Sequence, residues 1–148
     1  MKQKKGFDKL MPILKQRLVK GGKINRISAV TRSVSKVRGD IISDIQRGSK
    51  TGIVYEKYNP RRTHQASAEG EAPATDTGEL VREITVSVFT RKKGTGEEVV
   101  GQIVSGAPYS KFLEFGTTDM EPRPFMQKNL EKNRNNIKKI FLDEGLIR

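Results

Sequence analysis

Two acidic residues one helical turn apart are the first place where this sequence suggests chemistry. Asp40 and Asp44 lie four residues apart in a segment with helical periodicity, so both carboxylates would project from one face of a helix. Such a pair can share a metal ion, but no third carboxylate or histidine accompanies it. We therefore expect Asp40 and Asp44 to form salt bridges with Lys36 and Arg47, as acidic residues on exposed helices commonly do.

The other residues with catalytic potential are isolated. His64 is the only histidine, and it lies beside Arg61 and Arg62 in a polar segment, where a surface position is far more common than a role as general base. The pattern Gly94-Thr95-Gly96 lacks the order of lysine and hydroxyl residues found in a phosphate-binding loop, and it precedes a predicted strand rather than a helix. The chain has no cysteine, which excludes disulfides and thiolate sites. We expect no enzyme, no cofactor and no metal.

Positive charge is concentrated at the beginning of the chain. The formal net charge is +12, and residues 1–50 hold 14 Lys and Arg against three acidic residues. This uneven distribution suits a polyanionic partner, either nucleic acid or an acidic protein surface. The alternative is a solvated helical face that only keeps the protein soluble. The residues predicted to contact DNA or an acidic partner are Lys2, Lys4, Lys5, Lys9, Arg26, Arg32 and Arg38.

No specific nucleic-acid motif accompanies this charge. Zinc-finger, RRM, KH and helix-turn-helix signatures are missing, and aromatic residues, which would stack on bases, make up only 6% of the chain. Lysine and arginine alone bind phosphates without sequence preference.

The composition predicts a thin hydrophobic core. Hydrophobic residues make up 34% of the 148 residues and charged residues 31%. We therefore expect part of the apolar surface to be buried against a neighbouring chain. No apolar run approaches the roughly 20 residues of a membrane span, and no signal-peptide apolar region follows the basic N-terminus. A soluble protein outside the secretion pathway, without a membrane partner, is expected.

The hydrophobic periodicity predicts a single α+β domain over 1–148. Residues 1–6 form a basic arm, and 7–48 hold two helices, at about 8–19 and 24–46. In the second helix apolar residues recur every three or four positions, although Gly39 costs it about 1 kcal/mol relative to alanine. A short strand at 52–58 precedes a long polar loop at 59–77.

The remaining segment, 78–148, is predicted to hold the sheet and the C-terminal helices. Strands at 83–90 and 98–105 form a β-hairpin in a small antiparallel sheet. A short helix at 109–115 ends at Gly116, and a final helix covers 124–143, with Asn133 interrupting its apolar stripe. The long N-terminal helix, the short helix and the C-terminal helix are expected to pack on the sheet.

Two local patterns are more specific than these periodicities. The first is the segment Thr77-Gly78-Glu79-Leu80-Val81-Arg82. The second runs from Tyr109 to Glu114-Phe115-Gly116-Thr117 and is followed by Arg123-Pro124-Phe125. In this order, on either side of a hairpin, they resemble the tail completion family (neck, head–tail connector) of tailed bacteriophages over about residues 28–142. The first pattern departs from the family's because Val81 separates Leu80 from the arginine.

The resemblance implies a virion structural protein at the junction of phage head and tail. It implies a homo-oligomeric ring of six or twelve copies through which DNA passes, with portal, adaptor and tail proteins as partners. The protein would be made in the host cytoplasm and reside in the virion neck. The basic first third would face DNA or an acidic neighbouring ring. The alternative is a small sequence-independent nucleic-acid-binding protein of ribosomal or nucleoid type, which explains the charge but not the second pattern.

The second pattern is expected to form a corner of the fold that meets the next subunit, the alternative being a corner with a structural role only. The residues predicted at the subunit interface are Tyr109, Glu114, Phe115, Gly116, Thr117, Arg123, Pro124 and Phe125. Tyr109, Phe112 and Leu113 share one helix face and should pack into the sheet. Two prolines should hold Arg123 extended. We predict that Glu114 and Arg123 form a charge-assisted pair, within the subunit or across to the next.

Overall fold

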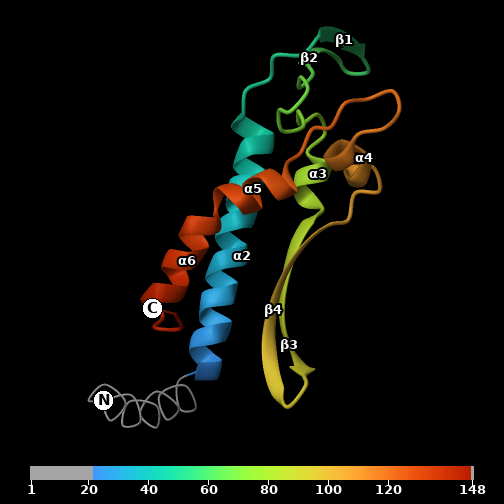
Figure 1. Cartoon of the computed structure of the whole chain (residues 1–148). Coiled ribbons are helices and arrows are strands. Elements are labelled where there is room, and N and C mark those ends of the chain that lie inside the picture. The colour runs from blue at the N-terminus through green and yellow to red at the C-terminus, as the bar shows by residue number, and fades with distance from the viewer. Residues whose placement is uncertain (1–21, 148) are drawn as a thin grey trace, which may run out of the picture. The chain divides into compact units, whose positions relative to one another are not determined.

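The computed structural model describes residues 22–147 and has the α+β fold that the sequence predicts. The predicted arm, the predicted helix at 8–19 and the four lysines Lys2, Lys4, Lys5 and Lys9 lie outside the described residues. The elements in chain order are α2 (Gly22–Arg47), β1 (Val54–Tyr58), β2 (Arg61–Gln65), α3 (Glu79–Arg82), β3 (Ile84–Lys93), β4 (Gly96–Ser105), α4 (Ser110–Phe115), α5 (Met126–Lys132) and α6 (Arg134–Asp143) (Figure 1).

The chain divides into two compact units, which are described separately. Among the described residues, unit 1 comprises 22–33, Val88–Gly101 and 135–147, and unit 2 comprises Val34–Ser87 and Gln102–Arg134. Among the described residues, no helix is both long enough and apolar enough to cross a membrane.

Two separate hairpins make up the β structure of the described residues. One pairs β1 with β2 and the other pairs β3 with β4 (Figure 1). The β3–β4 hairpin confirms the prediction of strands at 83–90 and 98–105. The β1–β2 hairpin corrects the predicted loop at 59–77, because residues 61–65 pair antiparallel with 54–58. Its second strand is almost entirely exposed, so it carries no apolar alternation by which a strand could be identified.

The core of unit 2 is built on one face of α2. Val37, Ile41 and Ile45 lie four residues apart and are almost completely buried, and Ile84 and Phe125 are buried as well. Each such side chain contributes about 1.5–3 kcal/mol when it is fully removed from water. The long helix predicted at 24–46 is thus confirmed, and its apolar stripe forms the core that supports the second pattern.

The predicted C-terminal helix is two helices rather than one. The break falls at Asn133, which has φ −90° and ψ 0° and separates α5 from α6. The amide of the Asn133 side chain donates to the carbonyl of Asn129 at 3.0 Å. The backbone N–H of Asn133 donates to the same carbonyl at 3.1 Å, so Asn133 closes the last turn of α5.

In unit 1, the start of α2 is tied to the chain's C-terminal segment through Glu144. Its carboxylate accepts hydrogen bonds from Ser28 Oγ at 3.0 Å and from Arg32 Nη1 at 2.8 Å. The hydrogen bond from Arg32, followed by that from Ser28, holds the pKa of Glu144 below its ordinary value. Glu144 therefore stays ionised and partners Arg32 at neutral pH.

Candidate functional site

The site predicted from the second pattern is the corner of unit 2 formed by residues 109–125, and Glu114 organises it. Glu114 lies on α4 and is only 9% exposed. Its carboxylate accepts the backbone N–H groups of Phe125 at 2.9 Å, Met126 at 3.0 Å and Gln127 at 2.9 Å. These groups open α5, where the first N–H groups of a helix have no partner within the helix and favour a negative charge. Glu114 thus caps α5 from a neighbouring helix.

The predicted pair between Glu114 and Arg123 is wrong within the chain. The Glu114 carboxylate is occupied by backbone amides, and among the described residues no carboxylate forms an ion pair with Arg123. Arg123 is instead anchored through its backbone, whose N–H donates to the carbonyl of Leu113 at 2.7 Å. Its side-chain Nε is buried and has no hydrogen-bond acceptor. The segment that carries Arg123 is therefore fixed by its backbone, and its guanidinium pairs with no anion of residues 22–147.

Gly116 ends α4, as predicted, and its conformation is one that other residues rarely adopt. Its φ is +77°, and its N–H donates to the carbonyl of Phe112 at 2.9 Å. A Cβ at this position would lie 2.7 Å from the carbonyl oxygen of Met120. The chain then turns back on itself, because the N–H of Thr117 donates to that same oxygen at 2.8 Å. The loop that follows α4 is thus closed by backbone contacts that require a glycine.

The predicted interface residues separate into a buried and an exposed group. Glu114 and Phe125 are buried and hold the corner together, whereas Phe115 is 75% exposed and Tyr109 and Thr117 are also exposed. Gly116, Arg123 and Pro124 are half-buried. The prediction that Phe112 packs into the sheet is wrong, since it is 46% exposed with Lys111 Nζ 4.9 Å from its ring centroid. The corner presents aromatic rings to its surroundings.

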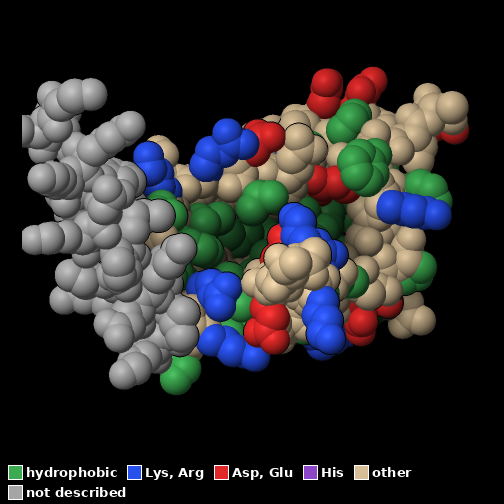
Figure 2. Space-filling view, turned by 60° about the horizontal axis from the view of Figure 1, so that its bottom comes forward, with side chains coloured by type: hydrophobic (Ala, Val, Ile, Leu, Met, Phe, Trp, Pro, Cys, Tyr) green, Lys and Arg blue, Asp and Glu red, His purple; other side chains and the backbone are tan. Residues whose placement is uncertain are grey.

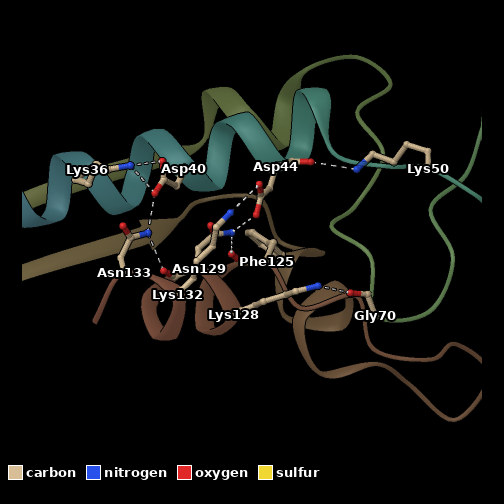
Figure 3. A network of polar contacts seen from close by, with 10 residues as sticks. All are labelled: Lys36, Asp40, Asp44, Lys50, Gly70, Phe125, Lys128, Asn129, Lys132 and Asn133. Carbon is tan, nitrogen blue, oxygen red and sulfur yellow. Dashed lines mark hydrogen bonds and ion pairs between the residues drawn. The ribbon is translucent and has the colours of Figure 1, made fainter. Parts of the chain in front are cut away.

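A polar network, missed by the sequence prediction, fixes α5 against α2 (Figure 3). Asn129 and Asn133 are completely buried, and their side-chain amides donate to Asp44 at 2.9 Å and to Asp40 at 2.8 Å. Both carboxylates come from α2. The spacing in the sequence could have indicated this network, because the two asparagines are four residues apart on one helix and the two aspartates are four residues apart on the other.

The ion pairs of this network confirm one predicted partner and correct another. Lys36 donates to Asp40 at 2.6 Å, as expected, but Asp44 pairs with Lys132 at 3.7 Å rather than with Arg47. Burial raises the pKa of Asp40, and the hydrogen bonds from Lys36 and Asn133 outweigh that effect, so the pKa lies below its ordinary value. No group of three or more potential metal ligands occurs among the described residues.

Three of the basic residues predicted to contact DNA or an acidic partner lie in the described part of the chain, and each donates to an acceptor within the chain. Arg26 donates to the carbonyls of Gly22 and Glu97, Arg32 to Glu144, and Arg38 Nε to the carbonyl of Ile84 at 2.8 Å. The structure does not gather them into one cluster of free cations. Their contact with DNA or an acidic partner remains a prediction.

Comparison with known proteins identifies a family. A family model described as "Bacteriophage HK97-gp10, putative tail-component" matches residues 14–116. The match covers the first pattern and ends at Gly116, so Arg123-Pro124-Phe125 lies beyond it. Searches of curated proteins and of solved structures found no match.

Proposed function

The chain belongs to the HK97-gp10-like family of bacteriophage tail components, and we propose that it forms a homo-oligomeric ring at the junction of phage head and tail. In this proposal the ring has six or twelve copies, lies between portal or adaptor proteins and the tail, and lets the genome pass through its centre. The role is structural, and the protein resides in the neck of the virion.

The observation that carries the proposal is the large apolar surface left exposed. Among the described residues, 15 large hydrophobic side chains are exposed, whereas eight hydrophobic residues form the buried core. Figure 2 shows hydrophobic side chains exposed on one face among lysines, arginines and acidic residues. Single exposed apolar residues are ordinary, but contiguous groups indicate an interaction surface.

Two such groups occur in unit 2. One is the corner, where Phe112 and Phe115 are exposed on α4, and the other is the start of β1, where Val54 is 58% exposed and the preceding Ile53 is 80% exposed. When two different patches of the same protein bind each other, each subunit is rotated relative to the last. The subunits form a ring if these rotations add up to a full circle. Two apolar patches on one unit are consistent with that kind of contact.

The fixed geometry of the corner supports its use as a contact surface rather than as a reaction site. Its backbone is held by Glu114 and Gly116, so Phe115 is presented from a rigid turn. A backbone that is already held in place loses less entropy when a partner covers the side chains on it. We assign Phe115 as the central contact of the proposed subunit interface.

Electron microscopy of the purified protein, with and without DNA, tests the proposal. Rings in the absence of DNA would support it, and the variant Phe115→Ser should reduce ring formation while leaving the unfolding transition of the monomer unchanged. Ile147→Ser, which alters an exposed hydrophobic residue of unit 1, serves as a control for loss of surface hydrophobicity. A monomer that never associates, even with portal or tail proteins present, would contradict the proposal. Particles that form only on DNA would favour the nucleic-acid-binding alternative.

A further inference from the structure

The β3–β4 hairpin has two long edges that no other strand of the described residues joins. Each strand has ten residues, and the two form a sheet of their own (Figure 1). Of all the residues in these two strands, only Ile84 is buried. A two-stranded hairpin is marginally stable by itself, and sheets commonly gain stability from further strands. The hairpin thus has room for another strand on either side.

Contacts within the hairpin show which of its backbone groups face outward. The N–H of Gly106 donates to the carbonyl of Glu83 at 2.9 Å, and Arg91 Nε lies 2.9 Å from Glu98 Oε2 across the strands. Along an antiparallel pair, residues that bond the partner strand alternate with residues whose N–H and C=O point away from it. The outward residues in this register are Ile84, Val86, Val88, Thr90 and Lys92 on β3 and Glu97, Val99, Gly101, Ile103 and Ser105 on β4.

Two contacts from α2 agree with this assignment. Arg38 Nε donates to the carbonyl of Ile84 at 2.8 Å, and Arg26 Nη1 donates to the carbonyl of Glu97 at 3.3 Å. Both carbonyls belong to the outward set. Within residues 22–147, no hydrogen bond reaches the outward groups of Val86, Val88, Thr90, Val99 and Ile103. Each edge therefore keeps backbone donors and acceptors that a further strand could use.

The long edges lack the features by which proteins usually protect an open strand. Short length, charged side chains and proline commonly keep edge strands from pairing with other chains. Residues 84–90 and 99–105 contain no charged residue and no proline. The β1–β2 hairpin has all three features, since its strands have five residues each, Arg61 and Arg62 lie on β2, and Pro60 precedes β2. This contrast within one chain indicates that the β3–β4 edges are suited to pairing.

The charges near the turn identify the strand that fits each edge. β3 ends in Arg91, Lys92 and Lys93 and holds no acidic residue, whereas β4 begins with two glutamates and holds no basic residue. Within the hairpin, Glu98 pairs with both Arg91 and Lys93, so the two strands complement each other when they run antiparallel. A second β3 could not offer an acidic residue to the basic end of the first. The β4 strand of a second copy, with its hairpin pointing the same way, would bring its glutamates to that end.

We infer that β3 of one copy pairs with β4 of the next copy, so that the hairpins join into one antiparallel sheet running around the ring. Backbone hydrogen bonds hold such added strands, as in other cases of β-augmentation. Each copy uses both of its edges, and closure of the ring leaves no edge open. The inference rests on the proposed ring, because it takes the partner to be a second copy. It adds a backbone contact to the aromatic contact at Phe115.

Hydrogen exchange in the unaltered protein is the first test. Rings and monomers are separated by size-exclusion chromatography, exposed to D₂O, quenched and read residue by residue by mass spectrometry. The outward amides of Val86, Val88 and Val99 should exchange at least about tenfold more slowly in the ring than in the monomer. The amide of Ser87, which faces β4, should change less. Equal exchange of the outward amides in ring and monomer would overturn the inference. So would protection of these amides in the monomer, because the chain itself would then cover the edge.

Proline substitutions block one edge at a time. Thr90→Pro removes an outward N–H from β3 and Val99→Pro removes one from β4, and proline is tolerated where a strand N–H faces away from the sheet. Each variant should raise the concentration needed for ring formation by about tenfold or more. The controls Thr90→Val and Val99→Thr keep the N–H and should stay within about twofold. Unfolding of the monomer shows whether each variant folds, and hydrogen exchange decides the matter for one that does not.

Mixing the two proline variants tests which strands meet. Thr90→Pro keeps an open β4 edge and Val99→Pro keeps an open β3 edge, so one junction can form between them. In native mass spectrometry with one variant ¹⁵N-labelled, mixed dimers should exceed the dimers of either variant alone. Dimers that Val99→Pro forms equally well by itself would show β3–β3 pairing and would overturn the inference.

These outcomes separate the inference from the proposed function. If both proline variants form rings at the same concentration as the unaltered protein, the inference is wrong and the proposed function stands. If the unaltered protein forms no rings under any condition, the proposed function fails, and the sheet between copies fails with it.

Discussion

The carboxylate of Glu114 accepts the backbone N–H of Phe125 at 2.9 Å, and this contact joins α4 to the first turn of α5. Phe125 is completely buried, so the same contact also fixes the largest side chain of the unit 2 core. Glu114 therefore holds the corner in shape, and its side chain is almost completely buried.

Replacement of Glu114 should destabilise the isolated chain. In Glu114→Ala three backbone N–H groups lose a charged acceptor, and hydrogen bonds to charged groups are worth about 1.5–3 kcal/mol. Glu114→Gln keeps one acceptor oxygen and should lose less. Urea unfolding of the monomer measures both changes. An unfolding free energy that Glu114→Ala leaves unchanged would show that the cap contributes nothing to the fold.

Removal of Asn129 should cost more than removal of an exposed asparagine. Asn129→Ala deprives Asp44 of a partly buried hydrogen bond and leaves the carbonyl of Phe125 without its side-chain donor. We expect a loss of about 1.5–3 kcal/mol. Asn135→Ala, at an exposed position of α6, is the matched control and should change stability by less than about 0.5 kcal/mol. Equal losses would argue against the network.

Stability should depend on pH through Asp40. Its pKa in the folded chain lies below the ordinary value, so its contribution is complete above about pH 4 and is lost as the pH falls through the folded pKa. The partner Lys36 is about half exposed, so the ion pair should contribute no more than about 1 kcal/mol. The stability difference between the unaltered chain and Asp40→Asn should therefore shrink as the pH falls from about 5 to about 3. A difference that stays constant over this range would count against this linkage.

Two glycine substitutions should have opposite effects. Gly39 lies within α2 and an added Cβ would meet no atom within 4 Å, so Gly39→Ala should stabilise the chain by about 0.5–1 kcal/mol. Gly116 has φ +77° and its Cβ would lie 2.7 Å from a carbonyl oxygen, so Gly116→Ala should destabilise it by about 1–3 kcal/mol. Thermal unfolding of both variants provides the measurement. The same sign for both would refute the conformational argument.

Neutralising three lysines of the basic arm and Lys9 of the helix predicted after it should weaken binding to polyanions. The variant with Lys2, Lys4, Lys5 and Lys9 changed to glutamine should show a smaller dependence of DNA affinity on salt, with the slope reduced by about 0.9 for each phosphate that the variant no longer neutralises. Fluorescence anisotropy over a salt titration, with two unrelated DNA sequences, measures this. An unchanged slope would mean that these lysines are exposed to solvent and contact no phosphate. Strong discrimination between the two DNA sequences would favour the nucleic-acid-binding alternative.

The parts of the fold that could be predicted from the sequence are those where one face is apolar. The stripe that includes Val37, Ile41 and Ile45 indicated α2 within two residues at its start, and the alternation around Ile84 indicated the β3–β4 hairpin. The strand β2 escaped prediction because its residues are polar on both faces, and its pairing depends on contacts with β1.

For the candidate site, the sequence predicted which residues take part more accurately than it predicted which groups they contact. Gly116 ends α4 as expected, but Glu114 bonds backbone amides where an arginine was expected. A carboxylate has several suitable donors within reach, and only the course of the backbone decides between them. The buried asparagines escaped prediction for a related reason, since an asparagine in a helix is usually taken as an interruption of the apolar stripe.

The two aspartate–asparagine pairs between α2 and α5 have a consequence for how finely these helices are aligned. Asp40 and Asp44 are one turn apart, as are Asn129 and Asn133. Asp40 pairs with Asn133, and Asp44 pairs with Asn129. A slide by a fraction of the roughly 5.4 Å pitch would break both pairs, whereas a slide by a whole turn would keep one. The pairs therefore oppose small misalignments most strongly. A slip of a whole turn would also displace Phe125, which is completely buried in the core.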